Sequence, residues 1–238
     1  MNIIITMAGR SQRFIEAGYT IPKYMIEVKE KTIFNYAISS LKNFIPKNGF
    51  IFITDKNHFA NEFVKNECAK LNIKKYKIIE LEKTTDGQAT TALLAESVID
   101  DNNESILIYN IDTYVNPDAL SPSLIKGEGW VPSFRAEGNH WSFVEFDEKD
   151  KVKKIEEKIK ISDYATIGLY YFSSFNLFQL AYNNYFSNNP SLVIKEKYVA
   201  PLYKYLIDNL YSVYTSVIQR TDVNSLGTPK ELAVFQLK

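Results

Sequence analysis

Short apolar runs alternate with longer amphipathic stretches along the first half of the chain. The run over residues 2–6 lacks polar alternation, which predicts a strand buried on both faces. Residues 50–54 predict a second buried strand, and 76–81 and 105–111 predict two further strands. Between them, the pattern predicts helices over residues 32–45, 57–72 and 87–100. Strands separated by helices of this length imply right-handed crossovers and a mostly parallel sheet.

The second half of the chain has a different pattern. Residues 141–147 and 164–172 alternate or run apolar like antiparallel or mixed strands, and a further strand is predicted over 211–218. Helices are predicted over 174–186, 196–209 and 229–236. Because no Pro-, Gly- or Ser-rich linker separates 1–115 from 116–238, we expect one α/β domain over 1–238, its mixed, mostly parallel central sheet flanked by helices.

Composition narrows the function classes. The 238 residues carry 28 basic and 28 acidic side chains, so the positive footprint of a general nucleic-acid binder is missing. One Cys and two well-separated His argue against a disulfide framework and a Cys- or His-based metal site, so a divalent ion would need oxygen ligands. No run approaches the roughly 20 apolar residues of a membrane span, and the opening is too short for a signal peptide. We therefore expect a cytoplasmic protein with no nucleic-acid or membrane partner.

The loop after the first strand carries the clearest chemical signal. In open parallel sheets, ligands bind beyond the carboxyl ends of the strands. There, Gly9 lets backbone amides approach a ligand closely, and Arg10 and Arg13 add positive charge, so the loop can cradle an anion. Lys23 follows ten residues later on a segment stiffened by proline. Three cations at one strand end suggest triphosphate chemistry; a solvated basic loop is the alternative.

This segment also carries a family resemblance. The pattern MAGRSQRF…AGYTIPKYMIEVKEKTIFNYAISSL resembles the opening AGGxGxRL…PKPLxxVxxKPxI of the sugar nucleotidylyltransferases, or nucleoside-diphosphate-sugar pyrophosphorylases. Further matching patches follow in the same order over essentially the whole chain: Asp86-Gly87-Gln88-Ala89, Asn110-Ile111-Asp112, Ile155-Glu156-Glu157-Lys158, Ala165-Thr166-Ile167-Gly168-Leu169-Tyr170, Glu196-Lys197-Tyr198 and Leu226-Gly227-Thr228-Pro229. The resemblance implies a Rossmann-like fold with a nucleotide-binding half (1–115) and an acceptor-binding half (116–238).

The implied reaction is attack of an acceptor phosphate on the α-phosphorus of a nucleoside triphosphate, with release of pyrophosphate. Such a step depends mainly on positioning and charge neutralisation. By its place in the family pattern, Arg13 would neutralise the β- and γ-phosphates, and Lys23 would bridge the α-phosphate and the acceptor. Asp112 follows a predicted strand and would hold Mg²⁺ through a carboxylate oxygen; the alternative is a turn cap before Pro117.

The resemblance assigns the remaining site residues by substrate. The nucleotide would contact Ala8, Gly9, Arg10, Ser11, Gly87 and Gln88, and the side-chain amide of Gln88 could pair with the base edge. Asp86 could also cap the helix that begins there. The acceptor would contact Glu157, Lys158, Thr166, Gly168 and Glu196, with Lys158 on its phosphate. For Lys158, a solvated charged strand is the alternative.

Two positions depart from the family pattern. Ser11 replaces the second glycine of the opening loop and Gln12 its small polar neighbour, which predicts an altered loop shape. Family members usually carry an acidic second metal ligand two residues before the late Gly-Thr, where this chain has Ser225. Asp222 or Asn224 could substitute if the loop rearranges; the alternative is that the second metal is lost and Asp112 alone brings Mg²⁺ with the nucleotide. We assign Asp222 as the second ligand.

The sequence leaves the exact substrates open. The family resemblance favours pyrimidine over purine nucleotides, and among the pyrimidines we place CTP slightly ahead of UTP and dTTP. The acceptor would be a sugar 1-phosphate of a capsule or surface-glycan pathway, or another small phosphate. A glycosyltransferase on the same scaffold and a non-catalytic nucleotide-binding regulator are the alternative functions, and a homo-oligomer is possible.

Overall fold

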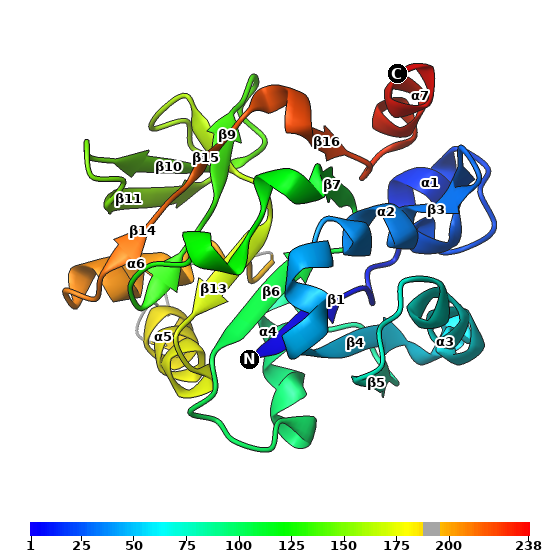
Figure 1. The fold of residues 1–238 in the computed structure, drawn as a ribbon, viewed down its shortest axis with the longest axis horizontal. Helices are drawn as coiled ribbons and strands as arrows, with labels where there is room; N and C mark the ends of the chain where they lie inside the picture. The colour runs from blue at the N-terminus through cyan, green and yellow to red at the C-terminus, as the bar shows by residue number, and fades with distance from the viewer. Residues whose placement is uncertain (188–195) are drawn as a thin grey trace.

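A seven-stranded sheet runs through the centre of the molecule (Figure 1), in a computed structural model that describes residues 1–187 and 196–238. Its order is β14-β8-β13-β6-β1-β4-β5, and its strands are β1 (Asn2–Thr6), β4 (Gly49–Asp55), β5 (Tyr76–Leu81), β6 (Ile106–Asn110), β8 (Gly129–Trp130), β13 (Leu169–Phe172) and β14 (Val213–Tyr214). The strands β5, β4, β1 and β6 run parallel, whereas β13 is antiparallel to both its neighbours. The predicted mixed, mostly parallel sheet is therefore confirmed.

Helices cover both faces of this sheet, which explains the unbroken apolar run of β1. Ile3 and Ile5 lie in the core shared with α2 (Ile33–Ser39) and α3 (Asn61–Lys70). Ile4 points to the other face, whose core includes apolar side chains of three helices. Those helices are α4 (Gln88–Leu93), α5 (Phe175–Ser187) and α6 (Leu202–Asp208).

A second, five-stranded sheet lies beside the central one and was not predicted (Figure 1). Its order is β11-β10-β12-β9-β15, and its strands are β9 (Ser133–Arg135), β10 (Ser142–Phe146), β11 (Val152–Glu157), β12 (Tyr164–Thr166) and β15 (Val217–Ile218). The single strand predicted over 164–172 is wrong, because Gly168, with φ +79°, turns the chain from β12 into β13 of the other sheet. The strand predicted over 211–218 divides in the same way into β14 and β15.

Several predicted helices are shorter than expected. The chain continues beyond α2 and α4 as 3₁₀ turns, and α3 begins only after Phe59, which takes a left-handed φ of 49° and is 85% exposed. The 3₁₀ segments are η1 (Lys23–Met25), η2 (Lys42–Lys47), η3 (Lys56–His58), η4 (Leu94–Val98), η5 (Pro117–Ala119), η6 (Pro122–Leu124) and η7 (Arg220–Asp222). Thr32 caps α2, since its side chain accepts a bond from the backbone N–H of Asn35. No helix of the described residues is both long and apolar enough to cross a membrane.

The last helix packs against the loop that follows β1. Four elements form this region: α1 (Gln12–Glu16), the hairpin β2 (Glu27–Val28) with β3 (Lys31–Thr32), the ribbon β7 (Thr113–Val115) with β16 (Val223–Ser225), and α7 (Pro229–Leu237). Phe14 of α1 is fully buried in one cluster with Leu226, Leu232 and Phe235. Segments from both ends of the sequence therefore meet at one end of the sheet (Figure 1).

Candidate active site

The loop after β1 places Ser11 in the conformation that usually requires glycine. Its φ is 53° and its ψ is 30°, in the left-handed region, and α1 begins with the next residue. The Ser11 hydroxyl accepts a 3.0 Å bond from the backbone N–H of Lys23. The side chain that replaces a glycine thus connects the two basic segments that the sequence analysis singled out. A Cβ on the neighbouring Gly9 would meet no atom within 4 Å, so the loop is open there.

A buried tyrosine anchors the segment that carries Lys23. Tyr24 is 1% exposed, and its hydroxyl lies 3.1 Å from Thr54 Oγ1 at the end of β4 and 3.1 Å from His58 Nδ1. Burial raises the pKa of Tyr24 to about 12, so the hydroxyl stays protonated and available for these bonds. The backbone of Lys23 is therefore fixed to two strand ends.

Lys23 and Asp112 meet across the ends of β1 and β6. The Lys23 Nζ lies 2.5 Å from Asp112 Oδ2, and the two side chains are 20% and 24% exposed. The Asp112 backbone carbonyl accepts a bond from Leu226, which fixes the position of the carboxylate-bearing residue. Arg13 is exposed on the first turn of α1 and forms no ion pair with the described part of the chain. The structure thus brings the predicted catalytic lysine and metal ligand together and leaves the arginine free.

A second carboxylate lies beside Asp112. An ideal Cβ at Gly227 would stand 3.0 Å from Asp112 Oδ2 and 3.6 Å from Glu231 Oε2, so glycine keeps open a small space flanked by both groups. No three Asp, Glu, His or Cys side chains of residues 1–187 and 196–238 cluster as metal ligands. Mg²⁺ commonly takes one or two carboxylates and completes its shell with water and substrate phosphates. The donors beside Gly227 therefore fit a magnesium ion that arrives with a nucleotide.

The structure does not bring Asp222 to Asp112. Asp222 Oδ1 accepts a 3.0 Å bond from Asn116, before the ribbon of β16 and β7 begins. Along that ribbon Ser225 pairs with Thr113, and only Leu226 reaches Asp112. Four residues of strand correspond to roughly 13 Å. Asp222 therefore does not share an ion with Asp112, because the register places it at the wrong end of the ribbon.

Gln88 lies at the carboxyl ends of β1 and β6, where a base would bind. Its side-chain nitrogen donates to Asn110 Oδ1 at 2.6 Å and to Thr6 Oγ1 at 3.2 Å. Both amide hydrogens are thus engaged within the protein, and the amide oxygen is the group left for a ligand. Asp86 forms no side-chain cap on α4, contrary to prediction; it pairs with Lys197 at 2.8 Å instead.

The turn before Gln88 is joined to the segment that carries Glu196. Lys197 donates its N–H to Asp86 at 2.8 Å, and its carbonyl accepts from Ala89 at 2.9 Å. Gly87 has φ +154°, and a Cβ there would lie 2.3 Å from the Lys197 nitrogen. Only glycine allows this close approach, which couples the predicted nucleotide and acceptor residues through the backbone.

Three of the five predicted acceptor residues, Glu157, Lys158 and Glu196, form one polar cluster around Tyr198. The Lys158 ammonium lies 2.5 Å from the Tyr198 hydroxyl and 3.9 Å from Glu157, and Tyr198 donates to Glu196. Burial raises the pKa of Glu157, which accepts a bond from Ser142 and feels the negative charge of Glu196.

The same cluster faces the nucleotide side of the site. Burial raises the pKa of Tyr198, with the bond to Glu196 as the next cause, whereas the positive charge of Arg13 lowers it. Arg13 is therefore near enough to act electrostatically on the acceptor cluster. Arg13 of the predicted nucleotide-binding half and Glu196 of the predicted acceptor-binding half therefore both act on Tyr198.

Thr166 and Gly168 are occupied by contacts within the protein. Thr166 is 4% exposed and its hydroxyl lies 3.0 Å from that of Tyr170. A Cβ on Gly168 would lie 2.3 Å from Asn110 Nδ2, so the close approach that the sequence suggested is to Asn110. Gly168 thus packs against Asn110, the residue that accepts a bond from Gln88.

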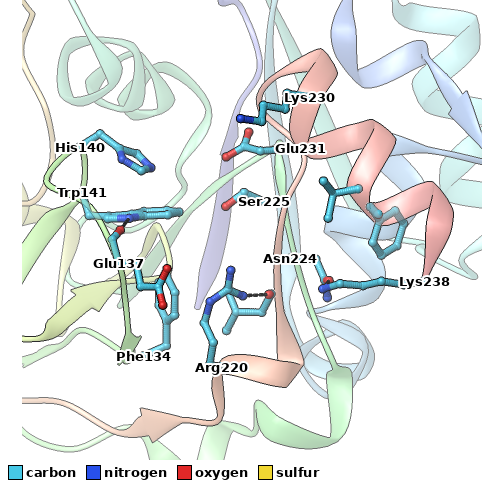
Figure 2. Close-up of a pocket in the computed structure, with 13 residues that line it drawn as sticks. Phe134, Glu137, His140, Trp141, Arg220, Asn224, Ser225, Lys230, Glu231 and Lys238 are labelled. Atoms are coloured by element: carbon cyan, nitrogen blue, oxygen red, sulfur yellow. Dashed lines mark hydrogen bonds between the residues drawn. The ribbon is translucent and has the colours of Figure 1, made fainter.

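A cavity of about 270 Å³ lies beside α7 and is lined by Glu231 but not by Asp112 (Figure 2). Phe134, Glu137, His140 and Trp141 line one wall, and Arg220, Ser225 and Glu231 line the other. The His140 and Trp141 rings are 4.5 Å apart, and Trp141 packs edge-on against Phe134. This cavity offers aromatic surface and charges of both signs. None of the predicted acceptor residues lines it.

Sequence reasoning missed Tyr24, Asn110, Tyr198 and Glu231 as site residues. Three of them stand next to or within motifs that were recognised: Tyr24 follows Lys23, Asn110 precedes Asp112 by two residues, and Tyr198 ends the Glu196 patch. Glu231 had only a weaker signal, its place three residues after a Thr that begins a helix.

Comparison with known proteins agrees with this arrangement. The family model for nucleotidyl transferases matches residues 2–197. A nucleoside-diphosphate-sugar pyrophosphorylase from Vibrio cholerae RC9 is 32% identical, each chain covered in full, with a TM-score of 0.92. Two structures share the fold at lower identity: the inositol-1-phosphate CTP transferase of T. maritima (16%, 99% of this chain and 94% of that one, TM-score 0.76) and a protein of Bacillus anthracis assigned as a glucose-1-phosphate thymidylyltransferase (17%, 100% and 94%, TM-score 0.78). No curated protein matches the chain. The family model and the 32% identical structure confirm the fold and the enzyme class that the sequence predicted, and the chain belongs to the nucleotidyl transferase family.

Proposed function

We propose that this enzyme transfers a nucleotidyl group from a nucleoside triphosphate to a phosphorylated small molecule, most simply a sugar 1-phosphate, and releases pyrophosphate in a magnesium-dependent reaction. The observation that carries the proposal is the meeting of Lys23 and Asp112 beyond the ends of β1 and β6, with Arg13 exposed and without an ion pair among the described residues. Cations that face a carboxylate at one strand end suit a polyphosphate that arrives with a metal ion. The reaction belongs in the cytoplasm, where nucleoside triphosphates are made.

The cations of the site act by neutralising and orienting phosphate. Arg13 binds the β- and γ-phosphates, whose charge increases as pyrophosphate leaves. Lys23 exchanges its bond with Asp112 for oxygens of the α-phosphate and the acceptor, and so holds the attacking oxygen in line. The bonds of Ser11 and Tyr24 to this segment keep the Lys23 backbone fixed during the exchange.

Asp112 would hold the magnesium ion through its carboxylate. When bound, Mg²⁺ supplies charge neutralisation at the triphosphate. The Asp112 carboxylate becomes available to the ion as Lys23 turns to the phosphates, so the site stays close to electrically balanced.

The acceptor binds at the cluster around Tyr198. Lys158 turns from the Tyr198 hydroxyl to the acceptor phosphate, while Glu157 and Glu196 accept bonds from hydroxyl groups of the acceptor. The bond between Ser142 and Glu157 holds that carboxylate in place.

The base is read by the Gln88 oxygen. Since the Gln88 nitrogen already donates to Asn110 and Thr6, the oxygen accepts from a donor on the base. Cytosine offers its amino group and uracil or thymine its N3–H, which agrees with a pyrimidine nucleotide. We propose CTP as the nucleotide substrate, ahead of UTP and dTTP, and we propose that the product is used in surface-glycan synthesis.

Thermal unfolding with different nucleotides tests the binding step. CTP, UTP, dTTP, ATP and GTP are each compared, with Mg²⁺, against the matching diphosphate. A triphosphate at one hundred times its Kd stabilises the native state by about 2.7 kcal/mol, which is roughly 5–10 °C in a chain of this size. Equal or greater stabilisation by a diphosphate would contradict the proposal and favour glycosyl transfer from a nucleotide sugar.

Pyrophosphate release from the selected triphosphate and a panel of sugar 1-phosphates tests the chemical step. We expect Lys23→Ala to lower kcat by about 10²- to 10³-fold, as loss of one preorganised electrostatic group does, with the exposed Lys65→Ala as control. Triphosphate binding without pyrophosphate release with any phosphate acceptor would instead indicate a regulator.

A further inference from the structure

The family's usual second acidic position is occupied by a residue that cannot replace it. Ser225 lies in β16 opposite Thr113 and carries no charge. Its neighbours Asp222 and Asn224 are engaged elsewhere, the first with Asn116 and the second with Lys238. A carboxylate beside Asp112 therefore has to come from another element.

We propose that Glu231 of α7 supplies the second carboxylate to the magnesium ion of the nucleotide, directly or through a water, in place of the missing acid at Ser225. This inference rests on the proposed function. Its geometric basis is Gly227: one point, where its Cβ would be, lies within 3.6 Å of both Asp112 Oδ2 and Glu231 Oε2. A larger residue at 227 would fill the space between the two carboxylates.

The backbone brings the two carboxylates together through a short and well-defined path. Leu226 donates to the Asp112 carbonyl at 2.8 Å, Gly227 follows, and Thr228 caps α7 by accepting from the Glu231 N–H at 3.2 Å. Pro229 occupies the first helical position, where its ring favours helix formation. Glu231 is therefore held in the first turn of the helix, next to the end of β6.

Capping explains only part of the Glu231 arrangement. In a capping box, the carboxylate at this position accepts from the backbone N–H of the capping residue. Here, among the described residues, Glu231 Oε2 accepts instead from the Thr228 hydroxyl at 2.9 Å, and no bond from the Thr228 N–H is formed. The carboxylate keeps accepting capacity for a cation.

The charge balance favours a divalent cation between these groups. Lys23 is the ammonium that neutralises Asp112, and it is the residue that turns to the phosphates in the proposed reaction. Its departure leaves two carboxylates near one another. Two negative charges side by side are costly unless a cation joins them, and Mg²⁺ accepts one or two carboxylates together with phosphate oxygens.

Glu231→Gln separates the proposed role from the structural one, since glutamine also serves in a capping box. Mn²⁺ binding is measured by electron paramagnetic resonance with a non-hydrolysable triphosphate of the base selected above. We expect Glu231→Gln to weaken Mn²⁺ binding by about 10- to 100-fold, as loss of a metal-orienting group does, while its thermal unfolding stays near wild type. The exposed Glu62→Gln on α3 serves as a matched control.

A second substitution tests directly whether Glu231 takes the place of the acidic residue that the family usually carries at position 225. Adding Ser225→Asp to Glu231→Gln puts a carboxylate back at the family position, and we expect it to restore most of the lost Mn²⁺ affinity. Unchanged affinity in Glu231→Gln, with wild type binding Mn²⁺, would overturn the inference and leave the proposed function intact. Absence of nucleotide-dependent Mn²⁺ binding in the wild-type protein would overturn both.

Discussion

Replacing Gly87 with alanine should destabilise the fold at the junction of the two substrate regions. Gly87 has φ +154°, and an added Cβ would stand 2.3 Å from the Lys197 nitrogen and 2.4 Å from its oxygen. Backbone atoms cannot rotate away, so the two segments must separate. The separation breaks the bonds from Lys197 to Asp86 and from Ala89 to Lys197.

The expected magnitude follows from these contacts. Two backbone hydrogen bonds contribute about 0.5–1.5 kcal/mol each, and a side chain in this backbone region adds about 1–3 kcal/mol of strain. The free energy of unfolding of Gly87→Ala should fall by about 2–6 kcal/mol, which lowers Tm by roughly 5–20 °C. Nucleotide affinity should fall as well, because Gln88 follows directly in the chain.

Thermal unfolding of three alanine variants separates strain from contact. Gly9→Ala meets no atom within 4 Å and carries no positive φ, so its Tm should match wild type. Gly18→Ala, with φ +90° and open space, should lose only the backbone contribution of about 1 kcal/mol. A Gly87→Ala protein no less stable than Gly18→Ala would refute the reasoning, because the close approach to Lys197 would then carry no energy.

Three further predictions concern the loop, the anchor and the metal ligand. Ser11→Gly and Ser11→Ala both remove the bond to Lys23, so both should lower kcat. Alanine keeps the left-handed backbone strain that serine already bears, whereas glycine removes it, so Ser11→Gly should be more stable than Ser11→Ala by about 1–2 kcal/mol; kinetics and thermal unfolding measure the two effects. Native Tyr24 keeps its proton up to pH about 12, whereas the unfolded chain releases it near 10. The free energy of unfolding should therefore fall as pH rises through this window, by up to about 2–3 kcal/mol from Tyr24, and denaturant titrations should find a smaller fall in Tyr24→Phe. Asp112→Asn should bind triphosphate more tightly without Mg²⁺, since Lys23 is released, and gain little when Mg²⁺ is added; calorimetry with and without the metal would contradict this if wild type and variant respond alike.

The sequence predicted the first half of the fold better than the second. The run at 2–6 matches β1 to the residue, because a central parallel strand buried on both faces is apolar without interruption. The run at 76–81 also matches β5 to the residue, although β5 is a partly exposed edge strand. In the second half the chain crosses between two sheets, and strands of two or three residues such as β14 and β15 leave no periodicity to read. Gly168 marked one crossing, but a glycine in a strand pattern is equally consistent with a bulge.

The sequence likewise predicted some residues of the candidate site correctly in place and misplaced others. Asp112 follows a predicted strand end and Lys23 lies on the loop segment singled out after the first strand, and the structure pairs them, since parallel strands bring their carboxyl ends to one edge. The pairing itself was not predicted. Asp222 was assigned by its nearness in sequence to Gly-Thr-Pro, but the pairing of β16 with β7 determines which residue faces Asp112. Glu231 is close to Asp112 only because α7 begins immediately after that ribbon, a tertiary arrangement that spacing alone does not contain.

The described structure neutralises most of its substrate-binding charges internally, and this limits how a ligand can bind. Lys23 is paired with Asp112, and Lys158 lies against Tyr198 and Glu157, so the phosphates of a substrate must displace these partners. Such an exchange replaces one charge-assisted bond by another, and its net gain is small for either lysine alone. Arg10 and Arg13 differ because neither gives up an ion pair within the described residues; Arg10 donates only to Thr84. The initial attraction of a polyphosphate should therefore come from these two arginines, and the two lysines contribute once the metal and the acceptor take over the interactions they leave.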